Sequence, residues 1–258
     1  MSTAFLITAA SILLYMTGWF IAARIRGRND IADVAWGLGF ILVAVVSLIA
    51  GGVYSTRGLL VSGLVLIWGL RLALHIYSRN RGRGEDPRYR KWREEWGKWF
   101  VLRSFLQVFM LQGMLLLMVA VPVVFANTSA YKPIGLLDLL GLVIWLYGFG
   151  FESVGDFQLL KFIRNPVNRG KLMTSGLWRY TRHPNYFGEV TLWWGIWLMT
   201  LAIEGGWLTI IGPLTITFLI LKVSGIPMLE KPYEDRADFQ EYKRRTSPFF
   251  PLSPKVGT

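Results

Sequence analysis

The chain has 258 residues, of which 53% are hydrophobic and 17% charged, and its formal net charge is +12. Its long uncharged apolar runs are typical of polytopic membrane proteins and exclude an ordinary soluble domain. The absence of cysteine excludes disulfides and cysteine-bound metals, and with only two histidines we expect no metal site. No nucleic-acid-binding motif accompanies the charge, so we expect no nucleic-acid partner.

Seven apolar runs match the roughly 20 residues that a membrane-spanning helix needs. The first has no charged n-region and no small-residue cleavage site, so we expect a retained helix rather than a signal peptide. A turn around Glu204, Gly205 and Gly206 separates the last two. The sequence therefore predicts an all-α polytopic integral membrane protein with a single membrane domain, residues 1–258. Its seven transmembrane helices lie at about 4–23, 31–51, 58–77, 104–126, 135–154, 187–203 and 206–222.

The loops predict the orientation. Residues 24–28, 79–103 and 161–182 and the tail carry most of the Arg and Lys, whereas the alternate loops hold only Arg57 and Lys132. By the positive-inside rule, the N-terminus lies outside and the C-terminus in the cytosol. We expect the cytosolic loops to cap a cofactor pocket.

Two short cytosolic helices and a lid are also predicted. Trp92, Trp96 and Trp99 recur at helical spacing, which predicts an interfacial helix over 91–99. Residues 156–163 form a second short helix, ended by Asn165-Pro166. The charged tail, 223–258, folds back as a lid over the pocket, or alternatively is a loose basic segment that binds anionic lipid.

The stretch from Ser175 to Glu189 gathers polar side chains between two apolar segments. Charged groups at membrane depth are costly and are usually functional, so this stretch predicts the floor of a polar pocket. The amide of Asn185 and the phenol of Tyr186 suit a carboxamide or carbonyl, although an interfacial aromatic belt also explains Tyr186. The polar members are Arg179, Arg182, His183, Asn185, Tyr186 and Glu189.

Asp33, at the start of the second span, is a candidate acid. A carboxyl group in an apolar site favours its neutral form, which can donate a hydrogen bond to a substrate carbonyl. The alternative is an interfacial residue paired with Arg28 or Arg71.

Arg71 lies inside the third span, on one helical face with Trp68 and His75. Arginine suits phosphate or carboxylate, and snorkelling to the interface is the competing explanation. The basic run 79–88 that follows, including Arg79 and Arg83, can hold a cofactor phosphate, although a positive-inside loop explains most of its charge.

Glu152 and Asp156 lie one helical turn apart, where they can bind ribose hydroxyls or simply neutralise the neighbouring bases. No dinucleotide fingerprint, phosphate-binding loop, nucleophile elbow or zinc-protease motif occurs. A nucleotide cofactor must therefore be held within the helical bundle.

Several motifs resemble the bacterial DUF1295 branch of the steroid 5α-reductase family. They are Asp33-x-x-Trp36-Gly, Trp68-Gly-x-Arg71-Leu, Gly84-Glu-Asp-x-Arg88-Tyr89 and the run Gly176 to Glu189. The resemblance implies a seven-helix reductase of the bacterial inner membrane that uses NADPH. It also implies hydride transfer to the C=C bond of an enone in a lipophilic, steroid-like or other lipid substrate, which enters from the bilayer. Membrane lipids are the other expected partners, and the oligomeric state stays open.

The resemblance also implies residue roles. Asn185 matches the asparagine that holds the nicotinamide, and Asp33 lies near the family's substrate-carbonyl glutamate. Trp68 stands where the steroid reductases have a catalytic tyrosine, which leaves Tyr77 or His75 as substitutes. The catalytic candidates are Asp33 and Tyr77, and the substrate-binding candidates are Asp33, Trp36 and Trp68. The cofactor-binding candidates are Arg71, His75, Arg79, Arg83, Glu152, Asp156, Arg164, Lys171, Arg179, Arg182, His183, Asn185, Tyr186, Glu189, Tyr242 and Arg245.

A second family is similar in the central motif. Isoprenylcysteine and phospholipid methyltransferases, which bind S-adenosylmethionine, resemble the chain in Arg182 to Gly188 and in the tail around Glu230 and Tyr242. Their tail has two adjacent glutamates, whereas Lys231 follows Glu230 here, and this difference favours the reductase. A non-catalytic, lipid-binding membrane protein is the remaining alternative.

Overall fold

The computed structural model describes residues 2–82 and 84–255, so the cofactor candidate Arg83 lies outside the described residues. The described residues form helices and no strand, and one isolated bridge pairs Thr181 with Ser247. The predicted all-α class is therefore confirmed.

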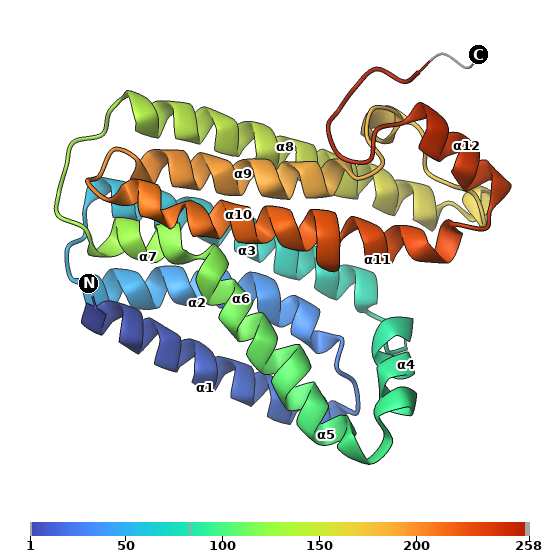
Figure 1. The fold of residues 1–258 in the computed structure, drawn as a ribbon, viewed down its shortest axis with the longest axis horizontal. Helices are drawn as coiled ribbons and strands as arrows, with labels where there is room; N and C mark the ends of the chain where they lie inside the picture. The colour runs from blue at the N-terminus through green and yellow to red at the C-terminus, as the bar shows by residue number, and fades with distance from the viewer. Residues whose placement is uncertain (1, 83, 256–258) are drawn as a thin grey trace. The chain divides into compact units, whose positions relative to one another are not determined.

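The chain divides into two compact units. Figure 1 labels the helices and colours them from the N-terminus to the C-terminus. Unit 1 comprises Met1–Gly135 and Thr200–Gly212. Its helical segments are α1 (Ser2–Arg26), α2 (Ile31–Gly51), α3 (Thr56–Asn80), α4 (Pro87–Trp96), η1 (Gly97–Trp99), α5 (Phe100–Arg103), η2 (Ser104–Met110), α6 (Leu111–Val119), α7 (Val121–Thr128) and η5 (Gly206–Ile210).

Unit 2 comprises Leu136–Met199 and Pro213–Thr258. Most of its chain is in long helices that are linked by short helical turns. Its segments are α8 (Leu136–Arg164), η3 (Pro166–Asn168), η4 (Gly176–Arg179), α9 (Pro184–Thr200), α10 (Ile211–Phe218), η6 (Leu219–Val223), α11 (Ile226–Glu230), η7 (Lys231–Tyr233) and α12 (Ala237–Arg245).

Sequence signals explain where the helices of unit 1 begin and end. Ser55 caps α3 by accepting a hydrogen bond from the Gly58 N–H at 3.1 Å. Asp86 caps α4 with Pro87 at the first helical position, where its missing N–H is not needed. Gly52, with a φ of +67°, follows the end of α2. Polar side chains thus mark the starts of α3 and α4, and a glycine marks the end of α2.

Helices α8 and α9 pack through glycines spaced seven residues apart. A Cβ on Gly188 of α9 would lie 2.4 Å from the backbone nitrogen of Glu152, and one on Gly195 would lie 2.6 Å from the Gly141 carbonyl oxygen. Gly148 faces Gly188 in the same way. Small residues at such crossings let membrane helices approach closely, and here they bring the acidic side of α8 against the start of α9.

Six helical segments among the described residues are long and apolar enough to cross a membrane. They are Ser2–Arg26, Ile31–Gly51, Thr56–Asn80, Pro87–Val119, Leu136–Arg164 and Gly206–Tyr233. The remaining predicted span, 187–203, corresponds to α9, which has 17 residues. A polytopic integral membrane protein is thereby supported, and the count of seven spans stays a prediction.

The predicted short helix over 156–163 is wrong as a separate element. These residues are the last turns of α8, which runs without interruption from Leu136 to Arg164. The physical reason is that no proline lies between Leu136 and Arg164. Pro166 is the first residue after them that lacks the N–H needed to continue the helical hydrogen bonds. The predicted interfacial helix falls on α4 and η1.

The C-terminal tail folds back on the stretch that precedes α9. The Arg182 N–H donates to the Ser247 carbonyl at 2.9 Å, and the Leu252 N–H donates to the Tyr180 carbonyl at 3.0 Å. The Thr181 hydroxyl donates to the Phe249 carbonyl at 2.8 Å. These contacts bind the tail to unit 2, and its role as a lid over a pocket stays a prediction.

Candidate functional site

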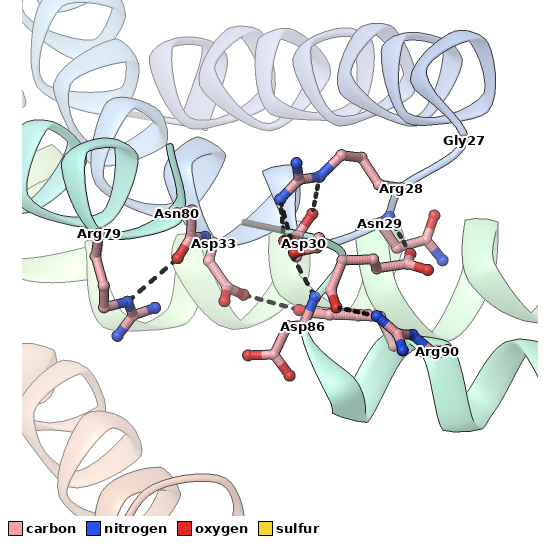
Figure 2. Close-up of polar contacts among 12 residues, drawn as sticks. Gly27, Arg28, Asn29, Asp30, Asp33, Arg79, Asn80, Asp86 and Arg90 are labelled. Atoms are coloured by element: carbon pink, nitrogen blue, oxygen red, sulfur yellow. Dashed lines mark hydrogen bonds and ion pairs between the residues drawn. The ribbon is translucent and has the colours of Figure 1, made fainter. Parts of the chain in front are cut away.

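Unit 1 contains a network of charged side chains where α2 and α4 begin, part of which Figure 2 shows. We call it the Asp33 cluster. It joins the loop before α2 to the loop before α4. Its members are Arg28, Asp30, Asp33, Glu85, Asp86, Arg88, Tyr89 and Arg93.

Asp33 is held by two side chains of α4. The Tyr89 hydroxyl donates to its Oδ1 at 2.8 Å, and the Arg88 Nη2 donates to its Oδ2 at 3.3 Å. Tyr89 is buried, whereas Asp33 and Arg88 are half-buried. The expected alternative partners of Asp33 were Arg28 and Arg71, and the ion pair is with Arg88 instead.

Asp86 holds Arg88 in place from the loop. Its Oδ1 accepts from the backbone nitrogen of Arg88 at 2.9 Å and from Arg88 Nε at 3.0 Å. Burial raises the pKa of Asp86, but the hydrogen bonds and charge of Arg88 lower it more, so the pKa lies below its ordinary value. Asp86 therefore stays ionised and orients the guanidinium towards Asp33.

Two further ion pairs fix the loop around this core. Arg28 donates to both oxygens of the buried Asp30, at 2.7 and 2.6 Å. Arg93 contacts Glu85 at 2.9 Å, and the same carboxylate accepts from the Asn29 N–H at 2.7 Å. Paired in this way, the acids and bases of the loop hold α4 against the start of α2.

Two of the three substrate-binding candidates, Trp36 and Trp68, belong to a chain of packed aromatic rings. Trp36 packs edge-on against Phe40 with ring centroids 5.1 Å apart, and Phe40 packs in the same manner against Trp68 at 5.2 Å. Trp68 is fully buried, so it forms part of the core of unit 1, while Trp36 is half-buried. Of the two, Trp36 is the better placed to touch a ligand.

The structure identifies a phenol, Tyr89, that was absent from the residues predicted for the site. Tyr77, a catalytic candidate, lies on α3 with 54% of its surface exposed, whereas Tyr89 contacts Asp33. The sequence signal for Tyr89 was the motif Glu85-Asp86-Pro87-Arg88-Tyr89, in which polar residues flank one proline.

The other candidates on α3 differ in exposure. Arg71 and His75, one helical turn apart, are both half-buried. Arg79 is exposed, and its Nε donates to the Asn80 side chain at 3.2 Å (Figure 2).

Unit 2 holds the second cluster, which we call the Asn185 cluster: Glu152, Ser153, Asp156, Asn185 and Glu189. Glu152 is 2% exposed and Asp156 is buried. The Asn185 Nδ2 donates to Asp156 Oδ1 at 3.2 Å. The carbonyl oxygen of Asn185 and the Ser153 hydroxyl are buried and have no hydrogen-bond partner among the described residues. Such groups are rare in native proteins and indicate a ligand or a water.

Arg182 and His183 are engaged with the tail. Arg182 forms a two-pronged pair with Glu230, Nε to Oε1 at 2.7 Å and Nη2 to Oε2 at 3.1 Å, and its Nη1 donates to the Thr246 carbonyl at 2.6 Å. His183 Nε2 lies 2.9 Å from the same Glu230 Oε1, and its ring stacks on Tyr186. We call this set the tail anchor.

The remaining candidates of unit 2 lie around the tail anchor. Arg164, Lys171, Arg179 and Arg245 are exposed, and Arg245 pairs with Glu241 at 2.5 Å. The Tyr242 hydroxyl donates to the Trp178 carbonyl, and burial raises the pKa of Tyr242. Among the described residues, no group of three or more acidic or histidine side chains is arranged to hold a metal ion.

The family model described as "Protein of unknown function (DUF1295)" matches residues 19–246. The chain belongs to this family. It is 26% identical over 167 residues to an uncharacterized protein of Schizosaccharomyces pombe, a match that covers 56% of this chain and 48% of that protein.

Two shorter matches concern named enzymes. The chain is 36% identical over 66 residues to a probable O-methyltransferase of Ustilaginoidea virens, covering 26% of this chain and 22% of that protein. It is 34% identical over 68 residues to the 3-oxo-5-alpha-steroid 4-dehydrogenase 1 of Mus musculus, covering 26% of each. The matches thus span about half or less of these relatives. No solved structure matches the chain. The family therefore has both reductase-like and methyltransferase-like relatives.

Proposed function

We propose that this protein is an NADPH-dependent membrane reductase, which transfers a hydride to the C=C bond of an enone in a lipophilic substrate. The observation that carries the proposal is the buried carbonyl oxygen of Asn185, which lies beside Asp156 and has no hydrogen-bond partner in the described part of the chain. The match to a steroid 4-dehydrogenase supports the same reaction class.

Asn185 suits a primary carboxamide. Its own amide nitrogen is turned towards Asp156, which leaves its carbonyl oxygen as an acceptor. A buried acceptor without a partner costs about 1–3 kcal/mol, so a ligand N–H at this position is favoured. The carboxamide of a nicotinamide supplies such an N–H.

The acids and bases around Asn185 suit the rest of a dinucleotide. Glu152, Asp156 and Ser153 lie within two turns of α8 and can contact ribose hydroxyls. The exposed bases Arg164, Lys171 and Arg179 of the same unit supply positive charge for phosphates. Arg182 has a different role in this proposal, because its guanidinium already holds Glu230 and the tail.

NADPH, when bound, supplies a hydride from C4 of its nicotinamide. As the enone accepts it at the β-carbon, negative charge develops on the carbonyl oxygen, and a hydrogen-bond donor at that oxygen lowers the barrier. Asp33 and Tyr77 stay the catalytic candidates of this proposal, because the one proton of the Tyr89 hydroxyl is already donated to Asp33.

The substrate enters from the bilayer, since the helices of both units expose many large apolar side chains. We place the protein in the bacterial inner membrane, with its N-terminus outside and its C-terminus in the cytosol, because its bases gather in alternate loops.

The experiment is a titration of the detergent-purified full chain with NADPH, NADH and S-adenosylmethionine, followed by tryptophan fluorescence and calorimetry. We expect NADPH to bind with the highest affinity and Asn185→Ala to weaken it at least tenfold. A chain that binds S-adenosylmethionine alone would overturn the proposal.

One observation favours a second candidate, an S-adenosylmethionine-dependent methyltransferase. Arg182 and His183, which belong to the motif shared with methyltransferases, converge on Glu230, and the O-methyltransferase match has the same order of identity as the reductase match. The titration separates the two activities.

A further inference from the structure

Two groups of bases in unit 1 differ in exposure and in what they contact. Arg28, Arg88 and Arg93 are half-buried, and each contacts an acid of the Asp33 cluster. A second group is exposed and lies on the end of α1 and the segment from η1 to α5. We call this group, with the apolar side chains among it, the basic edge: Arg24, Ile25, Arg26, Lys98, Trp99, Leu102 and Arg103.

Two contacts link α1 and the loop after it to the segments on either side of η1 and α5. The Phe20 ring lies 5.1 Å from the Phe105 ring, and the Arg93 Nη2 donates to the Gly27 carbonyl at 2.8 Å. The residue number on the α1 side increases from Phe20 to Gly27, while the number of the contacting residue decreases from Phe105 to Arg93. The two segments therefore run antiparallel. Arg24, one turn after Phe20, therefore lies level with Val101, one turn before Phe105. The end of α1, which carries Arg24 and Arg26, is therefore level with the segment that carries Lys98 and Arg103.

The basic edge keeps a net positive charge, because most of the nearby acids are paired with other bases. Asp30, Glu85 and Asp86 are each engaged by a half-buried arginine, and Glu95 pairs with Lys91. The exposed Glu94 is one acid against the four exposed bases of the basic edge. The sequence holds no acid between residues 96 and 112 and none between residues 1 and 29. An anion is the ligand that complements four exposed bases in this setting.

Apolar side chains of the basic edge identify the kind of anion. Ile25 is 81% exposed and Trp99 is 53% exposed, next to the charges. One turn further along each helix, towards the interior of a candidate span, Ile21 and Leu106 are also exposed. A charged band that continues into an apolar stripe matches a lipid head group and its acyl chain, whereas a free anion needs no apolar stripe.

We propose that the basic edge binds an anionic glycerophospholipid: Arg24, Arg26, Lys98 and Arg103 contact the phosphodiester head group, and the acyl chain follows Ile21 and Leu106. Trp99 lies at the interface between the two. The site belongs to unit 1 alone and is independent of the proposed reductase activity.

The test is native mass spectrometry of the detergent-purified full chain, titrated with phosphatidylglycerol and with phosphatidylcholine. Each base near an anionic head group contributes about 1 kcal/mol, or roughly a fivefold change in affinity. We expect the wild type to prefer phosphatidylglycerol at least tenfold. That preference should be lost in the quadruple variant Arg24→Gln/Arg26→Gln/Lys98→Gln/Arg103→Gln.

A control removes the same charge elsewhere. The preference should be kept in a quadruple variant that alters exposed bases of unit 2, Lys161→Gln/Arg169→Gln/Lys222→Gln/Lys255→Gln. An equal loss in both variants, or an unchanged preference in the first, would overturn the proposal. So would full displacement of the lipid by inorganic phosphate, because the apolar stripe would then be irrelevant.

A double variant tests the proposal if the quadruple variant of the basic edge does not fold. Arg24→Gln with Lys98→Gln should lower the preference by roughly fivefold or more, with an unchanged melting temperature in phosphatidylcholine. A double variant that folds and keeps the full preference would count against the site.

Discussion

The hydroxyl of Tyr89 donates to the Asp33 carboxylate at 2.8 Å, although the two residues are 56 positions apart in the sequence. This contact joins the first turn of α2 to the first turn of α4. It ties the two helices together through one hydrogen bond to a carboxylate.

Replacing Tyr89 by Phe removes the donor and keeps the ring. Because a hydrogen bond to a charged group contributes about 1.5–3 kcal/mol, we expect the free energy of unfolding to fall by about that amount. Unfolding in mixed detergent measures the loss. Tyr131→Phe, in an exposed loop, serves as the control. A Tyr89→Phe chain as stable as the wild type would contradict a stabilising contact.

Changing Asn185 to Asp keeps the size of the side chain but places a carboxylate next to Asp156. Because like charges in a buried site repel, and because the amide that donates to Asp156 is lost, we expect NADPH affinity to fall at least tenfold. Calorimetry measures the affinity, and a thermal melt shows whether the variant is folded. Wild-type affinity in a folded Asn185→Asp chain would show that this amide does not contact the cofactor.

The tail anchor predicts a change in protease sensitivity. Removing one partner of a buried ion pair costs about 3–5 kcal/mol, so Arg182→Gln should release the tail. Trypsin should then cut faster at Lys243, Arg244 and Arg245 on α12. Asp238→Asn, which breaks an exposed pair with Arg236 and leaves the Arg236–Gly170 contact in place, is the control and should leave the cleavage rate nearly unchanged. Equal rates in all three proteins would contradict the anchoring role.

The depressed pKa of Asp86 predicts a pH dependence. Since the folded pKa lies below the unfolded value of about 3.9, the ionised carboxylate stabilises the fold above that value and ceases to do so as the pH falls through the folded pKa. Asp86→Asn should therefore lower the melting temperature at pH 7, and the difference from the wild type should shrink below about pH 4. Thermal melts at both pH values test this, and a difference that grows on acidification would have the wrong sign.

The glycine crossing of α8 and α9 predicts a steric effect. A Cβ at Gly188 would meet backbone atoms that cannot move independently, so Gly188→Ala should destabilise the chain by about 1–3 kcal/mol. Gly150→Ala, on α8 with open space around it, should be neutral or stabilising. Unfolding in mixed detergent compares the two variants, and equal stability would refute the close packing.

The sequence by itself determined the helical class and most of the element positions. Apolar length predicted the spans, and Asn165-Pro166 marked a helix end, because a proline acts on the backbone within a few residues. The continuity of α8 through Asp156 was missed, since the apolar run ends before Asp156 and the polar residues after it were read as a separate helix.

Only the tertiary structure decided which side chains meet. For Asp33 the sequence offered a pair with Arg28 or Arg71 as the alternative to a catalytic role, and its partners are Arg88 and Tyr89. Arg182 stays a predicted cofactor ligand, and the partners that the structure gives it are Glu230 and the tail. The physical reason is that side-chain pairing depends on how helices cross and where distant loops return. Neither periodicity nor composition contains that information, because both describe one helix at a time.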